Sequence, residues 1–99
     1  MIMEFPIIYN DKSIKEVVRL IGYRVLRFNN AGGFSAVRRL TKNSYPRFHL
    51  IAGAQEKSAA VCKLHLDRQK PLLRGAFGHN GEHEGKAIEE EVARIKGLL

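Results

Sequence analysis

Residue types that bind metal ions gather in the second half of the chain. His65 and Asp67 lie two positions apart in AAVCKLHLD, and His79 and His83 follow in GHNGEHEG. Side chains two positions apart on a strand project from the same face. Imidazole nitrogens and carboxylate oxygens are ligands for zinc and related divalent ions. One interpretation is therefore a metal-binding domain or metal-dependent hydrolase that uses His65, Asp67, His79 and His83.

The spacing of these residues matches no familiar zinc motif, because the chain has no HExxH, no CxxC pair and no HxH. A solvent-facing ion pair between His65 and Asp67, with exposed histidines in the loop, explains the same residues without a cofactor. Nucleophilic catalysis has little support, since Cys62 falls on the apolar side of its strand and GxSxG is absent. The leading prediction therefore has no cofactor, and a divalent metal such as zinc is the alternative.

The charge of the chain favours a different kind of site. The net charge is +7, and residues 1–81 carry 14 Lys and Arg against 5 Asp and Glu, whereas residues 82–99 carry 3 against 5. A basic body attracts polyanions, although such a charge also keeps a small protein in solution. We therefore expect a non-catalytic binding domain for the backbone of RNA or DNA, with Tyr23 and Tyr45 as stacking surfaces. The predicted contacts are Arg24, Arg27, Arg38, Arg39, Arg47, His49, Lys63, Arg68 and Lys70.

The elements that must position these residues can be read from hydrophobic periodicity. Ser13 and Glu16 form a capping-box pattern before an apolar helical stripe that ends at Gly22. Residues 23–28 are rich in strand formers and precede the turn signal NNAGG, although a continued helix is the alternative. Three alternating strands follow up to Asp67, and a helix with an apolar stripe begins near residues 85–87. Residues 1–10 predict an edge strand or a packed arm.

Short turns between successive strands predict an antiparallel meander of about four strands, in an α+β fold with an N-terminal and a C-terminal helix packed on one face. The other face would carry Lys63, His65 and Asp67 into water. We expect residues 1–99 to form a single small domain with no membrane segment. The lone Cys62 fits a reducing cytoplasm. A small homodimer, built through an edge strand or the last helix, is a further alternative.

The segments YPRFHL, LHLDRQKP and HNGEHEG, followed by EEEVARIK, resemble a family of small bacterial proteins without an assigned activity. The family pattern is close to LHLDxxKP, then HxHxGEYEG, then an acidic helix. The resemblance covers most of the chain and implies a discrete domain but no mechanism. Phe77 stands in place of the first loop histidine of that pattern, and His83 stands in place of its tyrosine.

Overall fold

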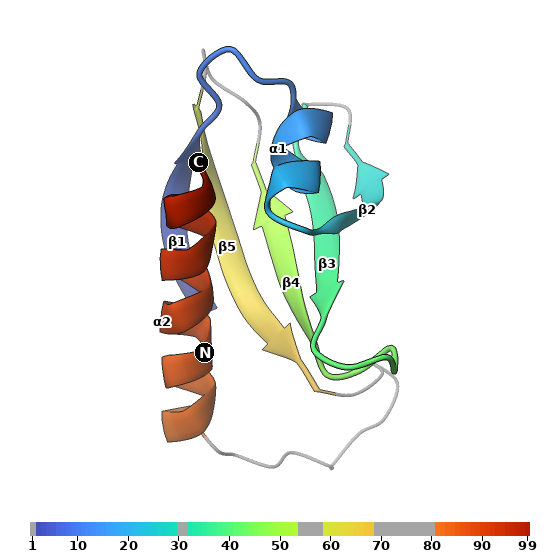
Figure 1. Ribbon diagram of the computed structural model, residues 1–99, viewed down its shortest axis with the longest axis vertical. Helices are drawn as coiled ribbons and strands as arrows, with labels where there is room; N and C mark the ends of the chain where they lie inside the picture. Colours follow the sequence, from blue (N-terminus) through green and yellow to red (C-terminus); the bar gives the residue numbers. More distant parts are fainter. Residues whose placement is uncertain (1, 30–31, 54–58, 69–80) are drawn as a thin grey trace.

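Five strands form one antiparallel sheet in the computed structural model, which describes residues 2–29, 32–53, 59–68 and 81–99, with residues 81–84 described by their backbone alone. The spatial order is β1-β5-β4-β3-β2, so β2 to β5 make the expected meander and β1 adds a fifth strand beside β5 (Figure 1). The N-terminal segment is thus an edge strand. The elements are β1 (Ile2–Ile8), α1 (Ile14–Leu20), β2 (Arg24–Phe28), β3 (Phe34–Arg39), β4 (Arg47–Ala52), β5 (Ala59–Asp67) and α2 (Gly81–Leu98).

The apolar face of the sheet is covered by both helices, with α2 alongside β1 and β5 and α1 near β2 (Figure 1). Alternation along each strand produces this face, because every second side chain points to the same side. Cys62 lies here and is fully buried, as its position in the strand predicts. The strand residues of the core include Phe5, Ile7, Phe34, Ala36, Phe48, Leu50, Ala52, Ala60, Cys62 and Leu64.

Helix α1 begins and ends where the sequence predicts. The Ser13 hydroxyl accepts a hydrogen bond from the Glu16 backbone N–H, and the Glu16 carboxylate accepts one from the Ser13 N–H. This capping box satisfies two backbone donors that the first turn leaves free. Gly22 follows the helix with φ +83°, a backbone conformation that glycine adopts without steric cost. The chain then enters β2, so the strand interpretation of residues 23–28 is confirmed.

Helix α2 begins at Gly81, several residues before the expected start near residues 85–87. Its predicted apolar stripe is confirmed, because Ile88, Val92 and Ile95 are buried against the sheet. Glu91 is also buried, with only 3% of its surface exposed. The sequence indicates it only as one of several acidic residues near the helix start, whereas the structure places it against the core.

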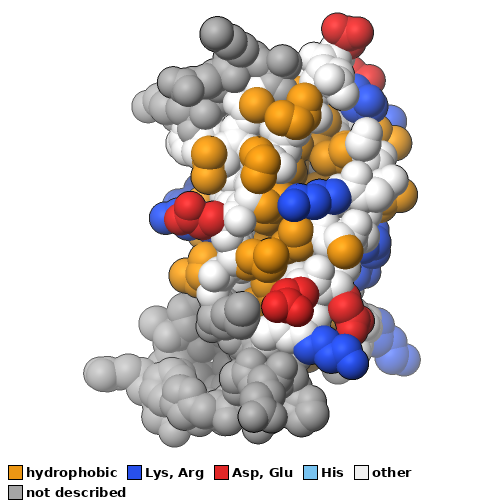
Figure 2. All heavy atoms as spheres, turned by 90° about the vertical axis from the view of Figure 1, so that its left-hand side faces the viewer, with side chains coloured by type: hydrophobic (Ala, Val, Ile, Leu, Met, Phe, Trp, Pro, Cys, Tyr) orange, Lys and Arg blue, Asp and Glu red, His pale blue; other side chains and the backbone are white. Residues whose placement is uncertain are grey.

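The outer edge of the molecule is formed by β1 and α2, and Figure 2 shows hydrophobic side chains gathered between charged ones on that side. A groove of about 450 Å³ runs there and is lined by β1 and the end of α2. Ile8 and Leu98 are about half exposed on these two elements. Within the described part of the chain, no helix is long and apolar enough to cross a membrane.

Candidate functional site

The candidate site lies on the open face of the sheet, which we define as the strand side chains turned away from both helices. Strand pairing places Arg47 opposite Asp67 and His49 opposite His65 on β4 and β5. Directly opposite residues in an antiparallel pair have Cβ atoms about 4.5–5.5 Å apart. Four polar side chains from two strands therefore meet in one small square, and we call His49, His65 and Asp67 the His-Asp cluster.

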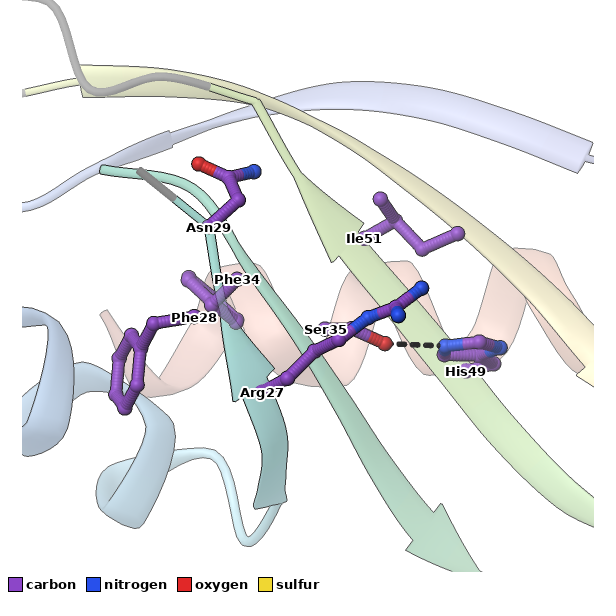
Figure 3. Close-up of a pocket in the computed structure, with 7 residues that line it drawn as sticks. All are labelled: Arg27, Phe28, Asn29, Phe34, Ser35, His49 and Ile51. Atoms are coloured by element: carbon purple, nitrogen blue, oxygen red, sulfur yellow. Dashed lines mark hydrogen bonds between the residues drawn. The ribbon is translucent and has the colours of Figure 1, made fainter. Parts of the chain in front are cut away.

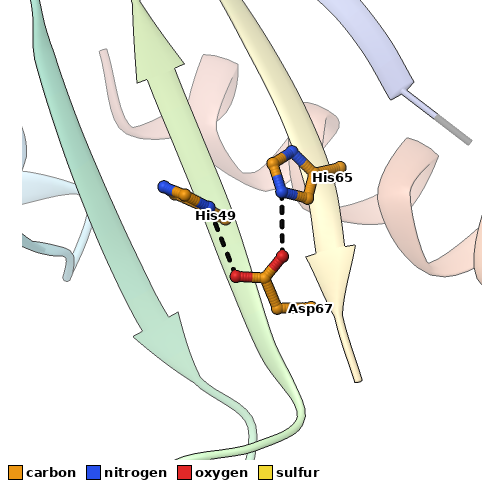
Figure 4. A group of neighbouring side chains, drawn as sticks. All are labelled: His49, His65 and Asp67. Atoms are coloured by element: carbon orange, nitrogen blue, oxygen red, sulfur yellow. Dashed lines mark ion pairs between the residues drawn. The ribbon is translucent and has the colours of Figure 1, made fainter. Parts of the chain in front are cut away.

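The Asp67 carboxylate is the centre of this cluster (Figure 4). Its Oδ1 lies 2.8 Å from Nε2 of His65, and its Oδ2 lies 3.2 Å from Nδ1 of His49. The Arg47 guanidinium also donates from Nε to Oδ2 at 3.2 Å. All three side chains of the cluster are largely shielded, with 17–26% of their surface exposed. The sequence predicts the shared face of His65 and Asp67, and the structure places both residues there.

The electrostatics of the site keep Asp67 ionised. Burial alone would raise the pKa of this carboxyl, but hydrogen bonds from His49 and His65 and their positive charge lower the pKa well below its usual value. A neutral imidazole can donate its N–H to a carboxylate oxygen at such a distance, and a metal ion can take the place of that proton. The Asp67 carboxylate therefore presents one oxygen to each imidazole.

Ser35 of β3 extends the cluster on the other side of His49. Its Oγ lies 2.5 Å from Nε2 of His49, so the two ring nitrogens of this histidine face a hydroxyl and a carboxylate. The ring of His49 also lies against that of His65, with centroids 4.7 Å apart. His49 is therefore fixed in orientation by three neighbours from two adjoining strands, β3 and β5.

A cleft of about 430 Å³ opens beside Ser35 and His49 (Figure 3). Arg27 of β2 reaches across Ser35 toward Ile51 and His49 in this view. The walls combine an exposed cation, a hydroxyl and an imidazole with apolar side chains. The lining residues are Arg27, Phe28, Asn29, Phe34, Ser35, His49 and Ile51.

The basic residues predicted to bind nucleic acid are divided between paired and unpaired positions. Arg47 is held by Asp67 and lies over the Tyr45 ring, 4.5 Å from its centroid. Lys63 forms an exposed ion pair with Glu4 at 3.8 Å. The Arg39 guanidinium donates to the backbone carbonyl of Lys42. The ion pairs with Asp67 and Glu4 partly neutralise Arg47 and Lys63, so this part of the open face is less cationic than its basic residues alone indicate.

Arg24 and Arg27 are different, because both are exposed and neither forms an ion pair or side-chain hydrogen bond with another described residue. Directly opposite residues in a sheet share a face. Arg24 is opposite Val37 and Arg27 is opposite Ser35, and these two β3 residues alternate with the core residues Phe34 and Ala36, so both arginines belong to the open face. Arg68 follows β5 directly and is exposed. Lys70 lies outside the described residues.

Arg38 and Tyr23 are placed differently from the expectation, because both lie on the helix-covered side. Arg38 shares this side with Phe34 and Ala36 and donates from Nε and from its terminal nitrogen to the carboxylate of Glu91 at 3.0 and 2.9 Å. Tyr23 is buried and donates its hydroxyl to the same carboxylate at 2.6 Å. Neither side chain is available to stack on a base or to bind phosphate from the open face.

The predicted metal ligands are only partly tested by this arrangement. His65 and Asp67 are brought together, whereas His79 and the side chain of His83 lie outside the described part of the structure. The third member of the observed cluster is His49, which the sequence indicated as a nucleic-acid contact. The sequence could not predict that His49 lies near His65, because this depends on how β4 and β5 pair. No motif around Ser35 marks that residue as part of a site. The alternation of RFHLIA does indicate that His49 faces away from the core.

Comparison with known proteins gave no match among protein-family models, curated proteins or solved structures. The geometry of the open face is therefore the basis for assigning a function.

The homodimer alternative concerns another surface, the groove between β1 and α2. Pro6 removes a backbone donor from the β1 edge and so weakens strand addition there. The homodimer stays a prediction, which light scattering can test.

Proposed function

We propose that this protein binds a divalent metal ion of the zinc class, with His49, His65 and Asp67 as its ligands. The observation that carries the proposal is the convergence of one donor atom from each residue within 4.8 Å of the others. Metal–ligand bonds of about 2.0–2.1 Å at tetrahedral angles require donor atoms about 3.3 Å apart. The N···O distances in the cluster, 2.8 Å to Oδ1 and 3.2 Å to Oδ2 of Asp67, are close to this spacing.

The neighbours of the cluster support the same assignment. A histidine that binds a metal usually donates its other ring N–H to an oxygen acceptor, which fixes the ring and its tautomer. The Ser35 hydroxyl is in position to accept that hydrogen bond from Nε2 of His49, leaving Nδ1 to face the ion. Arg47 orients the Asp67 carboxylate in a comparable way, although its positive charge lowers the affinity for a cation.

Two imidazoles and one carboxylate suit zinc, cobalt, nickel or ferrous iron better than magnesium or calcium, which prefer oxygen ligands. Three protein ligands leave at least one coordination position for water or another small ligand. Structural zinc sites normally have four protein ligands, whereas sites with three are typical of catalysis. The proposed centre therefore has the composition of a reactive site, supported on two neighbouring strands.

The hydrogen-bonded series Ser35, His49 and Asp67 contains the same three groups as a serine hydrolase triad, but its setting favours metal binding. A triad acts together with free N–H donors that stabilise the oxyanion. Ser35 lies within β3, which pairs with β2 on one side and β4 on the other. Its own backbone is thus engaged in the sheet, and we assign Ser35 to the orientation of His49.

The test is titration of tag-free protein with Zn²⁺ and Co²⁺ by calorimetry, because a polyhistidine tag would itself bind these ions. We expect one ion per chain and, for Co²⁺, visible absorption bands of a low-coordinate nitrogen and oxygen site. At a free Zn²⁺ concentration of 100 times Kd, the gain in unfolding free energy is about 2.7 kcal/mol. For a domain of this size that gain raises Tm by roughly 10–20 °C.

The variants His65→Ala and Asp67→Asn should lose the bound ion, since each removes one of three ligands. Lys63→Ala is the matched control, because Lys63 is on the same strand and face but outside the cluster. Circular dichroism without metal establishes that each variant is folded. Stoichiometric binding that is unchanged in both ligand variants, or no binding to the native chain, would remove the proposal.

A second candidate function is nucleic-acid binding, for which the unpaired Arg24 and Arg27 are the specific support. Phosphate contacts from these two residues would be largely sequence-independent and sensitive to salt. Gel-shift titrations of RNA and DNA at two salt concentrations test this candidate. The double variant Arg24→Gln/Arg27→Gln should weaken binding and reduce its salt dependence. Failure to bind at low salt would exclude this function.

A further inference from the structure

A β-bulge in β2 decides which side chain enters the cleft on the open face. Val25 is opposite Ala36, and the next paired residue of β2 is Arg27, opposite Ser35, so Leu26 is the extra residue. In a regular ladder Leu26 would be opposite Ser35, and Arg27 would be on the helix-covered side with Phe34. A single extra residue reverses the facing of every later residue in its strand. The bulge therefore brings a guanidinium to the cleft.

This guanidinium has no partner in the described part of the chain, although it is next to polar groups. Arg47, an arginine of β4 on the same face, is instead held in an ion pair with Asp67. An arginine that lines a concave site without a carboxylate retains its full capacity for a planar, two-point interaction with an anion. Figure 3 shows Arg27 on the same side of the sheet as Ser35 and His49.

The donors around the cleft fit phosphate better than carboxylate. The Arg27 fork can donate two hydrogen bonds, and the Ser35 hydroxyl, whose oxygen accepts from Nε2 of His49, can donate a third. A phosphate monoester has three terminal oxygens to accept them, whereas a carboxylate has two. Ile51 is 40% exposed at the same cleft and provides an apolar contact for the organic part of the ligand.

The dimensions of the cleft indicate a small molecule. Ligand sites for molecules of that kind usually measure about 300–1,000 Å³, and this cleft measures about 430 Å³. We propose that the cleft lined by Arg27, Ser35, His49 and Ile51 binds the phosphate monoester of a nucleotide-sized organic molecule. Arg27 is the principal phosphate contact and Ile51 contacts the organic part.

Calorimetric titration with adenosine monophosphate and with adenosine, in buffer containing a chelator, tests this proposal without a metal ion. One hydrogen bond to a charged group is enough to change affinity about tenfold, so the phosphate should improve affinity at least about tenfold. Arg27→Gln should remove that difference. Arg27→Lys should recover only part of it, because lysine keeps the charge but not the fork.

Arg24→Gln is the matched control, since it removes the same charge from the same strand and face but outside the cleft. It should change the affinity for adenosine monophosphate less than about threefold, because an exposed charge at a distance is screened by salt. Equal losses in Arg24→Gln and Arg27→Gln would overturn the proposal in favour of a diffuse cationic surface. So would equal affinities for adenosine and its monophosphate.

Two further measurements separate this proposal from the others. A short single-stranded oligonucleotide should bind no more tightly than the mononucleotide; much tighter binding that depends equally on both arginines would assign the face to polynucleotides instead. Lys63→Ala, which removes a cation from the same face outside the cleft and the His-Asp cluster, should leave the mononucleotide affinity unchanged. Loss of binding in that variant would place the phosphate nearer β5 and overturn the role of Arg27.

Discussion

Ser35 and His49 are joined by a 2.5 Å contact between Oγ and Nε2 although they are not opposite each other in the sheet. Val37 is opposite His49, and Ser35 is opposite Ile51, so the contact runs diagonally between β3 and β4. Diagonal neighbours on one face are within reach of long or aromatic side chains. The contact links the cleft to the His-Asp cluster through a single imidazole ring.

Ser35→Ala should reduce the affinity for Zn²⁺ by about 10- to 100-fold, because the hydrogen-bond acceptor that fixes the His49 ring is lost. The measurement is calorimetric titration of the tag-free variant. Ser44→Ala, at an exposed position in the loop between β3 and β4, is the control and should bind Zn²⁺ like the native chain. Equal affinities for all three proteins would show that Ser35 has no part in ordering the site.

Glu91 should make the fold sensitive to acid. Burial alone would raise the pKa of Glu91, but hydrogen bonds from Arg94, Arg38 and Tyr23 lower it from 4.5 to about 2. The unfolded chain therefore binds a proton at higher pH than the folded chain, and the stabilisation is complete above about pH 5. We expect the free energy of unfolding to fall as the pH is lowered from about 5 toward 2, as measured by denaturant titration.

Glu91→Gln should lower the unfolding free energy at pH 7 by about 2–3 kcal/mol, because it leaves two guanidinium groups without their carboxylate. This value is below that for a fully buried pair, since the Arg38 and Arg94 side chains are about one third exposed. The variant should also show a shallower loss of stability in acid, with Asp67 responsible for the remainder. Glu89→Gln, exposed on the same helix, is the control, and a response equal to that of Glu91→Gln would contradict the assignment.

Gly33→Ala should be strongly destabilising. A Cβ atom at this buried position would clash with the backbone carbonyl oxygen of Ala52 on β4 and with the Asn29 side chain. Asn29 in turn accepts a hydrogen bond from the Gly33 N–H at 2.8 Å, which links the residue after β2 to the residue before β3. We expect a loss of about 1–3 kcal/mol or more, as for other overpacked sites, measured by thermal and denaturant unfolding.

Gly97→Ala is the counterpart of this substitution, because a Cβ atom at Gly97 meets no other atom within 4 Å. The residue lies in the last turn of α2, where alanine has the higher helix propensity. The variant should be as stable as the native chain or more stable, by up to about 1 kcal/mol. A similar loss in both glycine variants would show that the crowding at Gly33 is not the cause.

Cys62 should be unreactive in the folded protein. Burial raises the pKa of its thiol to about 12, so almost no thiolate exists at neutral pH. A chromogenic disulfide reagent should react slowly with the native chain and should modify one thiol per chain at once in guanidinium chloride. Rapid reaction without denaturant would show that β5 opens readily beneath α2.

Much of the fold is encoded in local sequence patterns. The capping box at Ser13 and the apolar stripe through Ile88 specify the two helices without reference to distant residues. The alternation of β4 likewise separates Phe48, which is buried, from His49, which is on the open face. Alternation also places Arg38 on the side of Ala36, so an expectation based on charge alone misplaced that residue.

The sequence by itself determined which side chains share a strand face, because that alternation follows from the geometry of each extended backbone. Only the tertiary structure decided which residues from different strands meet. The pairing of His49 with His65, the bulge that turns Arg27 toward Ser35, and the contact between Arg38 and Glu91 all join positions that no local pattern relates. Strand register and helix docking are set by packing across the whole core, and a shift of one residue would separate the cluster.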